Sequence, residues 1–160
     1  MLSFQTRELL ENTFNRVRWI ALAMVGSLFI EAVVVEMIHW FVPFEGIARA
    51  EEGLSPSLQY VLIAVGLSDL VFLPFLRRSM LAGRGDGAEK RLIARLQAVT
   101  IATLAIAHFP ALMGLVIFVL WTSRWAFYGL WGVSLIVMLV YFPRLRFWEE
   151  WISGGGRMEV

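Results

Sequence analysis

Four long apolar stretches alternate with short polar connections along the chain. The apolar stretches cover residues 19–42, 57–76, 93–121 and 125–142. Each can cross a hydrocarbon core of about 30 Å, which takes roughly 20 helical residues. None shows the alternation of polar and apolar residues that membrane β-strands require, so the pattern predicts transmembrane helices. We therefore expect an all-α fold, a four-transmembrane-helix bundle built from two hairpins.

Residues that favour helix ends stand at the borders of these stretches. Ser55 and Pro56 precede the second stretch, as a candidate N-cap and a first helical residue. Pro43 and Pro143 follow the first and fourth stretches, where they end a helix. Only residues 122–124 separate the third and fourth stretches, so we expect a tight hairpin there.

Basic residues are distributed unevenly between the polar connections. The loop 77–92 holds five of them, whereas the connection 43–56 holds one, Arg49, beside three glutamates. Because cytoplasmic loops carry an excess of lysine and arginine, loop 77–92 is predicted to lie in the cytoplasm. Four spans then place both termini in the cytoplasm as well. The pattern predicts a multi-pass protein, integral to a bacterial cytoplasmic (inner) membrane.

Six of the seven tryptophans stand near the predicted membrane–water interfaces, where indole rings are enriched. These six are Trp19, Trp40, Trp121, Trp125, Trp148 and Trp151. Their positions agree with the four predicted spans.

Two flanking segments, 3–17 and 144–152, combine apolar and charged residues. In the first of them, Leu10, Phe14 and Val17 share one helix face. Both segments are predicted to be amphipathic helices that lie in the membrane interface. The alternative is that each flank is the cytoplasmic extension of the neighbouring helix.

Composition excludes several classes of function. The chain of 160 residues has room for a single membrane domain, with 59% hydrophobic and only 17% charged residues. It has no cysteine, which excludes disulfides and thiolate chemistry, and its net charge of +1 gives no argument for nucleic acid. No catalytic triad or phosphate-binding loop is visible. We expect no enzyme activity and no cofactor, and a lipid bilayer as the surroundings.

Three ionisable residues stand deep inside the predicted spans: Glu31, Asp69 and His108. A charged side chain near the bilayer centre costs at least about 2.5–3.5 kcal/mol, so these groups are expected to face the bundle interior, water or a partner. Glu31 and His108 each follow an arginine by 13 residues, which places both roughly 20 Å above the cytoplasmic edge. Asp69 stands eight residues before Arg77, so it is predicted to lie about 8 Å from them in depth.

Small residues line one face of the first and of the third predicted helix. These residues are Ala23 and Ser27 in the first helix and Thr103, Ala107, Ala111 and Gly114 in the third. Small side chains let helix backbones approach closely, so the two faces are predicted to pack together and to bring Glu31 towards His108. A glutamate–histidine pair in a low dielectric can share a proton, which suggests a proton-transfer or cation site. The alternative is an interhelical hydrogen bond that holds the bundle together.

Glu36 and His39 form a secondary candidate on the outer turns of the first predicted helix. They are three residues apart and share a face, where they are expected to reach interfacial water. The same spacing occurs in di-metal carboxylate bundles, but a second such motif is missing from the chain. We therefore expect no metal site.

One stretch, residues 105–120, resembles a known family. Its sequence Ala-Ile-Ala-His-Phe-Pro-Ala-Leu-Met-Gly-Leu-Val-Ile-Phe-Val-Leu is similar to the second helix of the proteolipid ring subunit (subunit c) of rotary ATP synthases. That family has an ion-binding carboxylate shortly before a Tyr-Gly-Leu-Val-like run. His108 stands where the family has Glu or Asp, so the ion-carrying role does not transfer to this position.

Two classes of function fit these observations. The first is a small accessory or structural subunit of a larger membrane complex, with other subunits or further copies of the chain as partners. The second is an oligomeric proton or cation transporter that works through Glu31, His108 and Asp69.

Overall fold

The structure, a computed structural model, describes residues 4–42, 46–47, 57–81 and 89–153. Its helices are α1 (Phe4–Phe41), α3 (Ser57–Leu81), α4 (Glu89–Trp121), α5 (Arg124–Val140) and α6 (Leu145–Ser153). The described part of the chain contains no strand, which confirms the predicted all-α fold.

Three of these helices, α1, α3 and α4, are long and apolar enough to cross a membrane. Helices α5 and α6 meet at an angle of 51°, and they provide a fourth span only if the bent pair is taken together. Helices α1, α3 and α4 are longer than the apolar stretches predicted, whereas α5 ends two residues before the predicted end. The largest difference is at the start of α1, which includes residues 4–18. The predicted loop 77–92 is partly helical, because α3 continues to Leu81 and α4 begins at Glu89.

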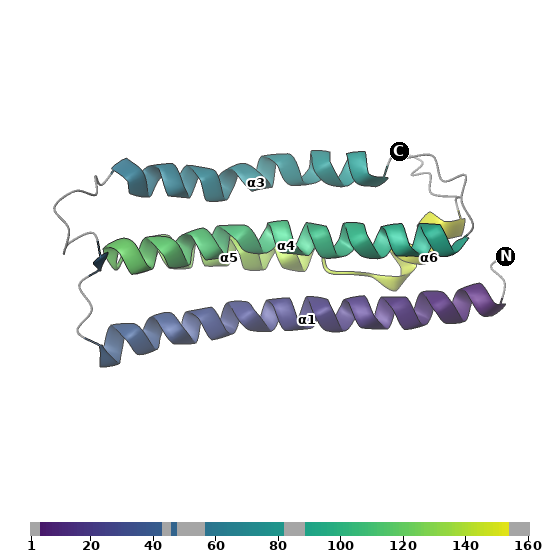
Figure 1. The fold of residues 1–160 in the computed structure, drawn as a ribbon, viewed down its shortest axis with the longest axis horizontal. Helices are drawn as coiled ribbons and strands as arrows, with labels where there is room; N and C mark the ends of the chain where they lie inside the picture. The colour runs from purple at the N-terminus through teal and green to yellow at the C-terminus, as the bar shows by residue number, and fades with distance from the viewer. Residues whose placement is uncertain (1–3, 43–45, 48–56, 82–88, 154–160) are drawn as a thin grey trace.

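Helix α4 is the centre of the molecule. Figure 1 shows α3 on one side of α4 and α1 on the other, with α5 largely behind it. Helix α4 packs on α1, α3 and α5, whereas α1 and α3 share no extended interface. The arrangement is therefore a central pair, α4 and α5, with one helix added on each side.

Exposed large apolar side chains form a belt around this arrangement. The belt extends from Trp19 to Phe41 on α1, from Tyr60 to Leu76 on α3 and from Trp125 to Val140 on α5. On α1 it is about 33 Å long at 1.5 Å per residue, which matches the thickness of a bilayer core. Contiguous apolar surface of this extent is not found on soluble monomers, and it identifies the membrane-embedded part.

Beyond the belt, the apolar side chains turn inward and form a second core, the terminal core. Its members are Leu10, Phe14, Val17, Leu81, Leu92, Ile93, Leu96, Val99, Trp148, Trp151 and Ile152. The flank 4–17 is thus a continuous extension of α1 whose apolar face is covered by protein, and this settles the alternative left open for it. Residue 3 lies outside the described residues.

The terminal core also corrects the prediction for the tryptophans of the second flank. Trp148 and Trp151 are only 1% and 3% exposed, and the Trp148 ring makes an edge contact with the Phe14 ring at 5.6 Å. They are buried because α6, after the 51° bend, packs on α4 and on Phe14 of α1, so neither ring is available to lipid headgroups. Trp19, Trp40 and Trp125, in contrast, are about 70% exposed at the two edges of the belt.

The buried face of α1 follows a heptad pattern along the whole helix. Its covered positions alternate steps of four and three residues: Leu10, Phe14, Val17, Ala21, Met24, Leu28, Glu31, Val35 and Ile38. This spacing keeps one stripe of a long helix against a neighbouring helix. It places Glu31 within the stripe that packs on α4.

Candidate functional site

Glu31 and His108 meet in the interface between α1 and α4. The distance between Glu31 Oε1 and His108 Nε2 is 2.8 Å, and their side chains are only 15% and 12% exposed. Helices α1 and α4 run in the same direction in Figure 1, so the two residues, each 13 positions after an arginine, come to a similar depth. The predicted approach of these two residues is therefore present in the structure.

A single hydrogen bond joins this pair, and either residue can be its donor. With Glu31 ionised, the His108 Nε2–H donates to the carboxylate; with Glu31 protonated, its hydroxyl donates to Nε2, and the neutral ring then carries its N–H on Nδ1. The other two polar atoms, Glu31 Oε2 and His108 Nδ1, are buried without a hydrogen-bond partner among the described residues.

Pro110 and Ser134 lie next to this pair. Proline lacks an N–H and leaves the carbonyl of Ile106 without its helical donor. The following N–H, from Ala111, donates to Ser134 Oγ of α5 at 2.9 Å. A serine from a neighbouring helix thus satisfies a backbone group beside the proline, as is common in membrane helices.

Only part of the predicted packing face of α4 contacts α1. Ala107 and Ala111 are buried against Ala21 and Leu28 of α1, together with Leu104. Gly114 instead faces α5, because a Cβ placed on it would lie 3.1 Å from the Phe127 carbonyl oxygen. For Gly114 the predicted contact with α1 is wrong.

The polar and small residues predicted around this face have local roles. Ser27 Oγ donates to the Met24 carbonyl oxygen, and Thr103 Oγ1 donates to the Val99 carbonyl oxygen, both at 2.7 Å. Ala23 is exposed, so its predicted packing is wrong as well. The α1 heptad explains why: it buries Ala21 and Met24 and turns Ala23 outward.

Asp69 is separate from the Glu31–His108 pair. It lies on α3, which packs on the side of α4 away from α1, and no hydrogen bond or ion pair reaches it from another described residue. Gly66 lies against Met113, so the antiparallel register puts Asp69 nearly level with Pro110. The predicted depth difference of about 8 Å is therefore too large, while a lateral separation across α4 was not foreseen.

A second polar cluster surrounds Glu36 at the outer end of the bundle. Arg124 Nη2 and the Tyr128 hydroxyl donate to Glu36 Oε1 at 2.7 and 2.5 Å, and Trp40 Nε1 donates to Oε2 at 3.0 Å. His39 is exposed, and its ring lies edge-on to Trp40. The sequence indicated Glu36 but missed Arg124 and Tyr128, although their spacing of four residues puts both on one face of α5.

One face of α4 is left uncovered between α1 and α3. Ala98, Ala105, Leu112 and Val116 are exposed and recur at steps of seven, seven and four residues. We refer to these four residues as the open α4 face. The other sides of the helix are covered: Gly114 is buried against α5 and Ala111 against α1. The open α4 face is the part of the helix surface that none of its neighbours covers.

Comparisons with protein-family models, with curated proteins and with solved structures find no match for this chain. The resemblance of residues 105–120 to the proteolipid ring subunit stays a prediction. In this structure, the position that resembles the ring carboxylate is His108, and its carboxylate partner comes from another helix, at Glu31.

Proposed function

We propose that the chain crosses the cytoplasmic membrane of a bacterium four times, with both termini in the cytoplasm. The apolar belt supports a fourth span, because α5 carries it over residues 125–140 although the helix has only 17 residues. The basic residues of loop 77–92 support the orientation. The terminal core then projects into the cytoplasm.

We further propose that the protein is an accessory subunit of a larger membrane complex. The observation that carries this proposal is the open α4 face. Two alanines in a stripe, flanked by α1 and α3, allow the backbone of another transmembrane helix to approach closely. The extended arrangement supports it too, since each outer helix is covered by protein on one side only.

The matched substitutions Ala105→Phe and Ala64→Phe test this function. Both alanines are exposed within the belt, but Ala64 lies on the outer surface of α3. Native purification in lipid particles, followed by mass spectrometry, should recover partner membrane proteins with the wild type and with Ala64→Phe. Ala105→Phe should lose them because the ring blocks the open face. A wild-type chain that is recovered alone and monomeric would contradict the proposal.

A second candidate function, proton transfer, is favoured by the Glu31–His108 contact. The two groups can exchange one proton across 2.8 Å without breaking their hydrogen bond. Ionisable residues in this position within a membrane commonly belong to proton or ion pathways. Asp69 contributes to such a pathway only through intervening water, because it lies on the far side of α4.

Flux measurements in liposomes separate the two functions. The wild type should acidify liposomes that contain a pH-sensitive dye when a potassium gradient drives protons inward. Glu31→Gln and His108→Gln should reduce the rate to that of empty liposomes. Glu36→Gln is the matched control, since it changes a carboxylate of the same helix that also forms an interhelical ion pair. If the wild type is no faster than empty liposomes, proton transfer by this chain alone is excluded.

A further inference from the structure

A cavity of about 240 Å³ opens where α5 ends and α6 begins. Arg77 of α3 and Thr100 and Thr103 of α4 form its inner wall, and residues 140–144 of the bend form its rim. None of the described residues that line it is acidic. We refer to this cavity as the bend pocket.

Two arginines give the bend pocket a positive charge. Arg77 is half-buried, and its Cζ lies 4.9 Å from the centre of the Tyr141 ring and 5.2 Å from that of Phe147. These cation–π contacts hold the guanidinium in place without neutralising it. No carboxylate among the described residues pairs with it. Arg144 stands exposed at the rim.

The first turn of α6 adds to this positive field. Helix α6 begins at Leu145, and the Trp148 N–H bonds to the Arg144 carbonyl oxygen, so Arg144 occupies the N-terminal end of the helix. The unpaired N–H groups of a first turn, together with the helix dipole, favour a negative charge at this end. The unpaired N–H groups and the helix dipole therefore both favour the binding of an anion at the bend.

The inner wall offers hydrogen-bond acceptors. Thr100 Oγ1 donates to the Leu96 carbonyl oxygen and Thr103 Oγ1 to the Val99 carbonyl oxygen, both at 2.7 Å. Since each hydroxyl proton is already used, the free lone pairs on these oxygens can accept from a ligand hydroxyl. The two arginines and the threonine acceptors of the inner wall suit a phosphate ester that carries hydroxyl groups.

The pocket lies at the edge of the apolar belt. Leu76 and Val140, the last exposed apolar residues of α3 and α5 at this end, stand directly beside Arg77 and Tyr141. Lipid phosphates lie at this level of a bilayer, with their acyl chains along the belt. We propose that the bend pocket binds the headgroup of an anionic phospholipid of the glycerol-phosphate type from the same leaflet.

Native mass spectrometry of the full chain with added lipid tests this site. The wild type should retain one phosphatidylglycerol against competing phosphatidylcholine. Arg77→Gln and Arg144→Gln should each weaken this retention about tenfold, the amount expected for one lost charge-assisted hydrogen bond. Arg78→Gln is the matched control, because Arg78 is the exposed neighbour of Arg77 and does not line the pocket.

Two further arms make the outcome decisive. Arg144 is exposed, so its substitution tests the site even if Arg77→Gln fails to fold. Inorganic phosphate at millimolar concentration should leave the bound lipid in place if the headgroup and chains are recognised together. Displacement of the lipid by phosphate would show a free-anion site and overturn the assignment to a lipid. Equal retention by Arg144→Gln, Arg78→Gln and wild type would overturn the site itself.

Discussion

The Ser134 hydroxyl accepts a hydrogen bond from the backbone N–H of Ala111 at 2.9 Å, one residue after Pro110. Both residues are fully buried. Because Pro110 interrupts the helical hydrogen bonds of α4 at this point, α5 supplies an acceptor from outside the helix. The two helices are thereby linked at the depth of the Glu31–His108 pair.

Ser134→Ala should destabilise the packing of α5 on α4. It removes the side-chain acceptor of the Ala111 N–H, a loss of about 0.5–1.5 kcal/mol for a typical hydrogen bond and nearer to 0.6 kcal/mol on average in membranes. Thermal unfolding in detergent, followed by tryptophan fluorescence, measures the loss. In a Pro110→Ala background the helical hydrogen bonds can re-form, so the same serine substitution should cost less. An equal cost in both backgrounds would contradict this coupling.

The sequence predicted the embedded part of this fold well because hydrophobicity and charge act locally. The predicted third stretch, 93–121, and the observed α4 end at the same residue, and α3 begins where it was expected. The approach of Glu31 to His108 also followed from the sequence, since equal spacing from an arginine gives equal depth. These inferences need only the length of each helix and the membrane as a reference plane.

The terminal core and the Glu36 cluster could not be predicted in the same way. Burial of Trp148 depends on how α6 packs after the bend, and an amphipathic segment can cover either lipid or protein. Arg124 pairs with Glu36 across 88 positions of sequence, and neither residue has a local signal for the other. One sequence signal for the terminal core was available. The heptad pattern of α1 continues through residues 10–17, which indicates that another helix packs on α1 there.

Gly114→Ala and Gly132→Ala should differ sharply in their effect. A Cβ at Gly114 would lie 3.1 Å from the Phe127 carbonyl oxygen and 3.2 Å from Leu130 Cβ, so α5 would have to move away. Overpacking of this kind typically costs 1–3 kcal/mol. A Cβ at Gly132 meets nothing within 4 Å, so no loss is expected there. Melting temperatures of the two variants in one detergent compare them directly, and equal values would contradict the close packing of α4 on α5.

Trp148→Ala should weaken the terminal core. Removing a buried aromatic side chain commonly costs about 3–5 kcal/mol, and here it also removes the edge contact to Phe14. Limited proteolysis should then cleave residues 145–153 faster than in the wild type. Trp125→Ala is the control, because that ring is 68% exposed and lies outside the terminal core. Equal protease resistance of both variants would show that α6 is not held by Trp148.

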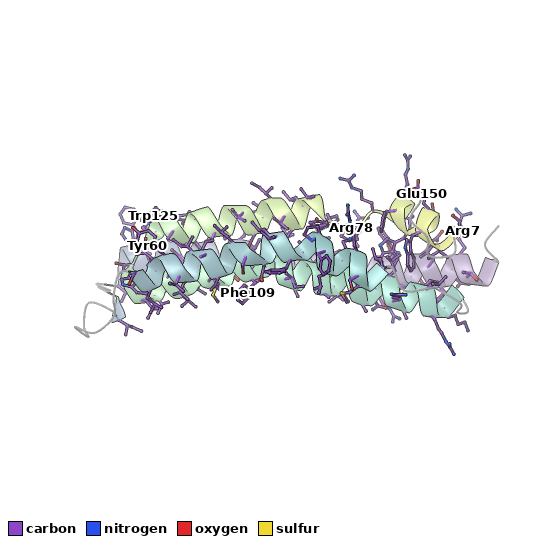
Figure 2. All side chains as sticks on the ribbon, turned by 90° about the horizontal axis from the view of Figure 1, so that it is seen from above. Arg7, Tyr60, Arg78, Phe109, Trp125 and Glu150 are labelled. Atoms are coloured by element: carbon purple, nitrogen blue, oxygen red, sulfur yellow. The ribbon has the colours of Figure 1, made fainter. Side chains whose placement is uncertain are left out.

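The orientation in the membrane can be tested by single cysteines, since the chain has none of its own. Figure 2 shows Arg7 and Glu150 at one end of the molecule and Trp125 at the other. With four spans and cytoplasmic termini, Arg7→Cys and Glu150→Cys should react with a membrane-impermeant maleimide only after the cells are opened. Trp125→Cys and Ile47→Cys, both exposed at the outer end, should react in intact cells. If Glu150→Cys also reacts in intact cells while Arg7→Cys does not, the α5–α6 pair places α6 outside, and three spans replace four.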